Sequence, residues 1–310
     1  MRVGVSLSSS VNTPDPAQAA KWMIERTRVA DRVALDSLSV GDHHAMAWPY
    51  YQNTPILGRL LAEWGPRPVG CLFLVPLWHP VLIAEHVGTL ASLVDGADTP
   101  FIVQTGIGSG AGQFAAMGAE LGSRGTELER RLAIAQALVA GEAVSSDDVH
   151  PGAAAGSASH TVQLGLVPAR PVEWWIGAGV PRALERAARM GTAWYGGPNL
   201  DAESGAAAIA HYRAACAELG KAPRSIVRKD AIVLADPGAA VARRDEILAQ
   251  GYRGMTAGQV VAGTPAEVAD QLAPFAELGF DDVIVRCMSV TQPEALETIE
   301  LLAEVRSLLR

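Results

Sequence analysis

The sequence lacks features that mark several large classes of protein. Its three cysteines, Cys71, Cys216 and Cys287, are odd in number and far apart, so neither a disulfide framework nor a zinc ribbon is expected. It contains no basic cluster, and its net charge of −8 disfavours nucleic acid or an anionic membrane as a partner.

Long hydrophobic runs are also missing. The apolar run VGCLFLVPLW at 69–78 is far shorter than a membrane span and is interrupted by Pro76. The N-terminal segment MRVGVSLSSS lacks the apolar core of a signal peptide. We therefore expect a soluble, cytoplasmic protein.

The chain has enough apolar sequence for a large core, with 49% hydrophobic and 19% charged residues. Short apolar runs alternate with longer amphipathic ones along its whole length. The expected strands are 3–7, 37–41, 69–75, 101–106, 173–177, 192–196, 225–235 and 281–287. The expected helices are 15–34, 54–64, 80–95, 181–191, 203–219, 238–250, 265–278 and 293–309, with more helical sequence between 106 and 140.

This alternation predicts an α/β fold with parallel strands and right-handed crossovers. Eight units in 310 residues favour a closed (β/α)8 TIM barrel over an open doubly wound sheet. The turn after the first strand, SSSVNTPDP, has no glycine, whereas an open nucleotide-binding sheet more often has a glycine-rich turn there. We expect a single domain, 1–310, with 141–171 inserted in one loop.

The sequence DHH follows the expected second strand, at the end of a barrel where chemistry takes place. The small residues of 37–41 share one face of the strand, which in a barrel is the inner face. If this alternation continues, His43 points over the barrel interior, and Asp42 and His44 point away. His43 is then a candidate for proton transfer; hydrogen bonding of both histidines to neighbouring loops is the alternative.

Metal binding is disfavoured by the spacing of the histidines. Ligands on one face of a strand are two residues apart, whereas His43 and His44 are adjacent. His79 and His86 are seven residues apart and do not form the i, i+4 pair of a helical zinc site. We therefore expect no metal site.

Three glycine-containing segments could approach a ligand closely. The segment TGIGSGAGQF at 105–114 follows the fourth strand. In Gly177-Ala178-Gly179, a strand gives way to a helix near Pro181, whose free N–H groups could bind an anion with help from Arg182 and Arg186. Ordinary turns are the alternative for both. The third, Gly70-Cys71, lies inside a strand and indicates a bulge or a close approach.

Several motifs, in this order, together resemble the luciferase-like flavin-dependent oxidoreductase family. They are SLSVGDHH, LVPLWHPVLIAEHVGTL, FIVQTGIGSG, LGSRGTELERRLAIAQALVAGE, WWIGAGVPRALERAARMGTAWY and GTPAEVADQLAPFAELGFDDVIV. The resemblance covers most of the chain. It implies a (β/α)8 barrel with an insertion before the fifth strand and a flavin or deazaflavin at the carboxyl mouth, near the second to fourth strands.

The resemblance also implies roles for particular residues. His43 would lie beside the reactive face of the ring, with Asp42 in the matching acidic position. Gly70-Cys71 would be a bulge behind the ring, often with a cis peptide bond. The cofactor phosphate would be received by Gly177, Ala178, Gly179 and Val180, and further cofactor contacts would come from Thr105, Gly106, Gly108 and Ser109.

Ser109 departs from the family pattern. Luciferase-like monooxygenases can carry a phosphate-binding arginine at this place, and deazaflavin-dependent sugar-phosphate dehydrogenases carry an acid. An uncharged side chain there weakens phosphate anchoring by this loop and disfavours a sugar dehydrogenase.

We therefore expect a monooxygenase that uses reduced FMN and dioxygen on a small organic substrate, with His44 and Trp48 in the substrate pocket. The alternative is a hydride-transfer enzyme using coenzyme F-420, whose anionic tail needs basic residues that the net charge disfavours. A metal-dependent hydrolase and a flavin-binding protein without turnover are the candidates from other classes. A separate flavin reductase and a second copy of the chain are the expected partners; the substrate stays open.

Overall fold

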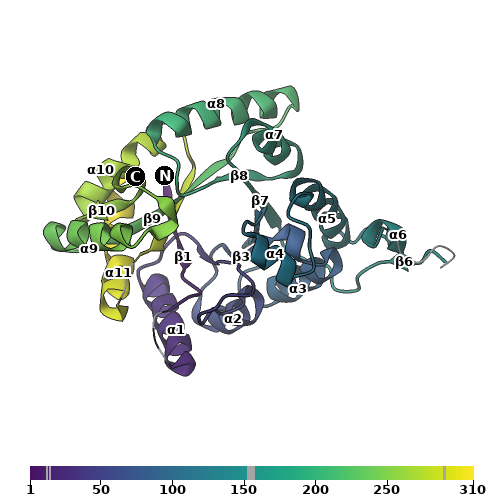
Figure 1. Cartoon of the computed structure of the whole chain (residues 1–310), viewed down its shortest axis with the longest axis horizontal. Coiled ribbons are helices and arrows are strands. Elements are labelled where there is room, and N and C mark those ends of the chain that lie inside the picture. Colours follow the sequence, from purple (N-terminus) through teal and green to yellow (C-terminus); the bar gives the residue numbers. More distant parts are fainter. Residues whose placement is uncertain (12, 14, 152–157, 289–290) are drawn as a thin grey trace.

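Eight parallel strands form a closed barrel in the computed structural model, which describes residues 1–310 except 12, 14, 152–157 and 289–290 (Figure 1). Strand pairing runs around the barrel, and the pairing of β8 with β9 closes it. The barrel strands are β1 (Arg2–Leu7), β2 (Leu38–Val40), β3 (Val69–Leu74), β4 (Phe101–Gly106), β7 (Val172–Ala178), β8 (Ala193–Gly196), β9 (Ser225–Val233) and β11 (Asp282–Cys287). The predicted (β/α)8 fold is confirmed.

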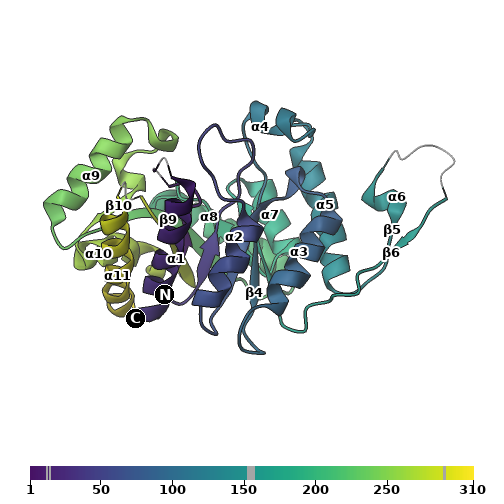
Figure 2. The ribbon, with the colours of Figure 1, turned by 90° about the horizontal axis from the view of Figure 1, so that it is seen from below.

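Helices surround the barrel (Figures 1 and 2). Many begin where the sequence supplies a capping side chain or an early proline, as Asp15 and Pro16 do for the first helix. The main helices are α1 (Pro16–Arg32), α2 (Asn53–Leu60), α3 (Pro80–Ser92), α4 (Ala111–Ala116), α5 (Arg124–Val139), α7 (Pro181–Met190), α8 (Ala202–Glu218), α9 (Pro237–Ala249), α10 (Pro265–Glu277) and α11 (Gln292–Leu308). In the described part of the chain, no helix combines the length and apolarity needed to cross a membrane.

A ninth strand, β10 (Val261–Gly263), was not predicted. It extends the sheet along β9, whose first three residues pair with β8 and whose last three pair with β10. Its three residues are too few to show the period of a strand in the sequence.

The predicted insertion lies before β7, the fifth barrel strand. It contains the short antiparallel pair β5 (Val144–Ser145) and β6 (Thr161–Val162), with the one-turn helix α6 (Ser146–Val149) between them. Figure 2 shows this hairpin projecting to one side of the barrel, beyond α5.

The barrel interior is packed. Five strands contribute one buried cluster to it: Ile102, Trp175, Ala193, Ile226 and Ile284. A much larger apolar core lies between the strands and the surrounding helices. Because the middle of the barrel is filled, ligands have room only at its ends, and polar side chains gather at the carboxyl ends of the strands.

Candidate active site

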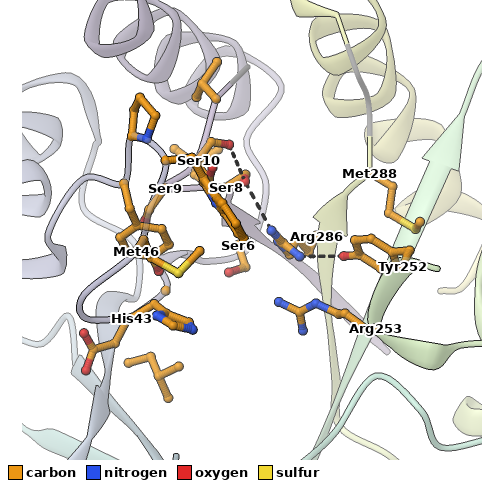
Figure 3. A pocket seen from close by; sticks show the side chains of 18 of the residues that line it. Ser6, Ser8, Ser9, Ser10, His43, Met46, Tyr252, Arg253, Arg286 and Met288 are labelled. Atoms are coloured by element: carbon orange, nitrogen blue, oxygen red, sulfur yellow. Dashed lines mark hydrogen bonds between the residues drawn. The ribbon is translucent and has the colours of Figure 1, made fainter. Parts of the chain in front are cut away.

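A cavity of about 910 Å³ opens at the carboxyl ends of β1, β2, β9 and β11 (Figure 3). We call it the mouth cavity. Its lining comes from the serine-rich segment after β1, the loop after β2, Leu72 of β3, and polar side chains of the β9–β11 region. Its volume lies within the range of small-molecule sites, about 300–1,000 Å³.

His43 lines this cavity and is half-buried. Its Nδ1 lies 3.0 Å from the carbonyl oxygen of His44. A carbonyl oxygen can only accept a hydrogen bond, so Nδ1 carries a proton. In the neutral form of the ring, Nε2 then has a free lone pair. Figure 3 shows the ring at the cavity beside Met46. The structure therefore places His43 where strand alternation predicted, with a proton acceptor available.

Asp42 and His44 form a brace beneath this loop. The buried carboxylate of Asp42 accepts hydrogen bonds from the backbone N–H of Leu74 at 2.7 Å and from the indole Nε1 of Trp78 at 2.8 Å. His44 Nε2 lies 3.4 Å from Asp42 Oδ1, and its backbone N–H donates to Gln113 in α4 at 2.9 Å. Asp42 still contributes to the cavity lining, whereas His44 does not.

Replacing Asp42 with alanine is expected to lower the free energy of unfolding by about 3 kcal/mol, because two buried donors lose their acceptor. Asp42→Asn keeps an acceptor oxygen at the same place and should lose less than half as much. Urea unfolding of both variants provides the measurement. Equal stability of wild type and Asp42→Ala would show that this brace is dispensable.

Trp48 lies in the cavity lining and is 59% exposed. The neighbouring Met46 and Pro49 also line the cavity. These apolar side chains form part of its rim, in the position expected for a wall of a flat pocket.

The backbone at Gly70 and Cys71 does not have the predicted conformation. β3 pairs residue for residue with β2 and β4, so there is no bulge, and no cis peptide bond occurs in the described residues. A Cβ at Gly70 would lie 1.7 Å from the carbonyl oxygen of Ile102, so glycine here permits close strand contact. Alternation turns Leu72 toward the cavity and Cys71 into the outer core, where burial raises the pKa of its thiol. The predicted bulge and cis bond are wrong, and sequence reasoning missed Leu72.

The carboxyl ends of β4 and β7 lie side by side, because the two strands pair. A Cβ on Gly177 would lie 2.4 Å from the carbonyl oxygen of Thr105. The predicted cofactor residues are Thr105 and Gly106 at the end of β4, Gly108 and Ser109 after it, Gly177 and Ala178 at the end of β7, and Gly179 and Val180 after it. None of them lines the mouth cavity. They form a separate glycine-rich surface on neighbouring strands at the same end of the barrel.

The start of α7 keeps the character of an anion site. Val180 precedes the helix without a side-chain cap, and a Cβ at Gly179 would meet no atom within 4 Å. Pro181 has no N–H, and the N–H of Ala183 donates to the carbonyl oxygen of Val180, so the N–H of Arg182 is the one left for an anion among the first three helical residues described. Arg186 was expected to add positive charge at this site. It is instead buried and donates a hydrogen bond to Glu129 at 2.8 Å, so this expectation is wrong.

An arginine cluster on the other side of the mouth cavity was missed by sequence reasoning. Arg228 of β9, Arg286 of β11 and Arg253 of the turn after α9 all line the cavity. The charged triplet RKD at 228–230, inside an otherwise apolar strand, was the available signal. The buried carboxylate of Asp230 lies 2.7 Å from Arg228, and the Tyr252 hydroxyl donates to it at 2.6 Å.

The model of the luciferase-like monooxygenase family matches residues 1–256. The chain belongs to this family. No curated protein matches the chain, but many solved structures do.

Solved structures of similar fold cover almost the whole chain. The protein MsnO8 in its apo form is 21% identical with a TM-score of 0.76, covering 99% of each chain. An F-420-dependent secondary alcohol dehydrogenase, bound to an F-420–acetone adduct, is 14% identical with a TM-score of 0.79 and full coverage of both chains. The oxygenating constituent of 3,6-diketocamphane monooxygenase from Pseudomonas putida, bound to FMN, is 14% identical, with a TM-score of 0.77, covering 99% of this chain and 98% of the other.

The residues at the mouth of this luciferase-like barrel fit a flavin-type cofactor. Three buried polar atoms near the carboxyl ends of β2 and β4 have no hydrogen-bond partner, namely Ser39 Oγ, Gln104 Nε2 and Thr105 Oγ1. Such atoms need a partner, and the pyrimidine edge of a flavin supplies both donors and acceptors. Among the described residues, no group of three or more His, Cys, Asp or Glu side chains is placed to hold a metal ion.

Proposed function

We propose that this family member is a monooxygenase that takes reduced FMN and dioxygen and oxidises a small organic substrate. The observation that carries the proposal is the place of His43, which lines the mouth cavity with Nδ1 bonded to the His44 carbonyl, beside the strands that hold the orphaned polar atoms. Both the family and the structural relatives consist of monooxygenases and oxidoreductases.

The glycine-rich loops would hold the cofactor. The loop after β4 would contact it with Thr105, Gly106, Gly108 and Ser109, and the segment Gly177–Val180 at the start of α7 would receive its phosphate. The ring would then extend toward Leu72 and His43. The bound ring would supply the redox chemistry of the reaction.

The side chains of the chain itself would control protons and water. His43 would accept or return a proton at Nε2. Asp42 and His44 hold the loop that carries His43, through the contacts to Leu74, Trp78 and Gln113. Trp48 and its apolar neighbours at the rim would keep water away from the reacting atoms.

A hydride-transfer enzyme using coenzyme F-420 is the second candidate, and one observation favours it. The net charge of −8 disfavours an anionic cofactor, but the arginine cluster makes the mouth cavity locally positive. A locally basic mouth could accommodate an anionic tail despite the acidic surface elsewhere.

Titration of the purified chain with reduced FMN and with F-420, followed by fluorescence, tests both candidates. We expect saturable binding of FMN at one site per chain and weaker binding of F-420, with oxygen consumed only in the FMN complex when substrate is added. Tighter F-420 binding without oxygen consumption would favour the second candidate. Binding of neither cofactor would exclude both.

The remaining expectations about partners stay proposals. A separate flavin reductase would deliver the reduced cofactor, and two copies of the chain would associate through helices next to the second and third strands. A metal-dependent hydrolase would instead carry stoichiometric metal in elemental analysis. A flavin-binding protein without turnover would retain flavin that no reductase can reduce.

A further inference from the structure

The arginine cluster concentrates positive charge on one side of the mouth cavity. Arg228, Arg253 and Arg286 come from three separate elements, yet all line the cavity that His43 also lines. Figure 3 shows Arg253 and Arg286 across the cavity from His43. Arg286 donates hydrogen bonds to the hydroxyl oxygens of Ser8 and Tyr252.

One buried carboxylate partly neutralises the three guanidinium groups. Asp230 is fully buried and pairs with Arg228 through Nε at 3.2 Å and Nη2 at 2.7 Å. Its second oxygen accepts from the Tyr252 hydroxyl and lies 3.8 Å from Arg286. Burial opposes ionisation of Asp230, but Arg228 and Arg286 outweigh it and hold the pKa of this carboxyl below its usual value.

The acidic side chain in the cavity lining does not neutralise the positive charge that remains on the arginine cluster. Asp42 is the single Asp or Glu in the described lining. Oδ2 of its carboxylate accepts from Leu74 and Trp78, and Oδ1 lies 3.4 Å from His44 Nε2 in the brace below the opposite wall. The arginine side of the cavity therefore has more positive than negative charge.

Arg253 is held toward the cavity by an unusual backbone conformation. Its φ of +51° lies in the left-handed region, between Gly251 at +80° and Gly254 at +66°. A non-glycine residue is strained there, and such strain commonly occurs at ligand sites. No ion pair of Arg253 occurs among the described residues. Burial and the nearby Arg286 and Arg228 lower the pKa of Arg253 by more than Tyr252 and Asp230 raise it.

We propose that the arginine cluster is the subsite for an oxyanion of the substrate, a carboxylate, sulfonate or phosphate group. Arg253 and Arg286 would bind this group, while Asp230 and Tyr252 position the guanidinium groups of Arg228 and Arg286. This assignment rests on the proposed function, in which the substrate reacts beside His43. The substrate is then an organic acid or an ester of phosphoric or sulfuric acid, with its reacting carbon directed toward His43.

The cofactor is the other possible source of an oxyanion. Under the proposed function its phosphate has a separate site at the start of α7, where a Cβ at Gly179 would meet no atom within 4 Å and no side chain caps the helix. The arginine cluster lies on β9, β11 and the turn after α9. None of the predicted cofactor residues at β4 and β7 lines the same cavity. This separation favours the substrate as the source.

Inorganic phosphate is the first probe, measured by isothermal titration calorimetry on the full chain at low ionic strength. We expect the wild type to bind phosphate, and Arg253→Gln to bind it about tenfold more weakly, the size of one charge-assisted hydrogen bond. Arg286→Gln should show a similar loss. Arg32→Gln is the matched control, because it removes the same charge from an exposed ion pair between Arg32 of α1 and Glu300 of α11. The phosphate affinity of this variant should not change.

The second arm separates the two sources of the anion. The ratio of affinities for FMN and riboflavin reports the contribution of the cofactor phosphate, and we expect Arg253→Gln to leave it unchanged. A collapse of this ratio would assign the cluster to the cofactor and overturn the proposal. Unchanged phosphate binding in both arginine variants, or none in the wild type, would overturn it as well.

These outcomes stay distinct from a failure of the proposed function. A chain that binds phosphate through the arginines but binds neither FMN nor F-420 would refute the proposed function. A chain that binds FMN but not phosphate would refute only the subsite. Arg253 has no ion pair in the described chain, so its replacement should preserve folding, which circular dichroism checks.

Discussion

Replacing His43 with alanine is expected to lower turnover by about 10²- to 10⁴-fold, the usual contribution of a general acid–base group. His43 presents a free Nε2 to the mouth cavity because its Nδ1–H is bonded to the His44 carbonyl. The alanine variant loses the proton acceptor but keeps the backbone and the brace formed by Asp42. Steady-state kinetics with the cofactor that binds in titration, together with the cofactor dissociation constant, provides the measurement.

Cofactor affinity should change little in His43→Ala, so the effect falls on kcat. A suitable control is His211→Ala, since His211 pairs with the exposed Glu185 on the outer helices and does not line the mouth cavity. It should keep wild-type turnover. Wild-type turnover in His43→Ala would reject the assigned role of this histidine.

Replacing Gly70 with alanine is expected to destabilise the barrel by more than about 4 kcal/mol, or to prevent folding. The added Cβ would lie 1.7 Å from the carbonyl oxygen and 2.5 Å from the carbonyl carbon of Ile102. Both are backbone atoms of the adjacent strand, which cannot rotate away as a flexible side chain can. β3 is also held on its other edge by β2, so the strand has no free direction of movement.

Gly165→Ala is the matched control. A Cβ there meets no atom within 4 Å, and its backbone does not require a positive φ. Its unfolding midpoint in urea should equal that of the wild type. A Gly70→Ala protein that folds with wild-type stability would show that β3 and β4 separate more easily than their pairing implies.

The strands of the barrel were predicted because they are buried on both faces and therefore appear as continuous apolar runs. The predicted strand at 101–106 matches β4 residue for residue. The alternation in 37–41 also located His43 correctly, since the two-residue period continued into the loop. β10 was missed because three residues are too few to show any period.

Predictions that depended on contacts with distant parts of the chain were less successful. Gly70 in a strand indicates a bulge or a close approach, and only the position of the Ile102 carbonyl distinguishes the two. Arg186 was a candidate phosphate ligand until its pairing with Glu129 of α5 was visible. In both cases the deciding atom belongs to a distant part of the sequence.

By itself, the sequence determined the alternation of strands and helices, the eight-strand barrel, the insertion before β7 and the place of His43 at the end of β2. The strands, the helices and the place of His43 follow from periodicity within short segments, whereas the insertion follows from the composition of 141–171 and is also implied by the family resemblance. The tertiary structure alone decided that Arg228, Arg253 and Arg286 converge, and that Asp42 and His44 brace the loop through Trp78 and Gln113. The physical reason is that β9 and β11 pair side by side in the closed barrel, and no local pattern encodes that proximity.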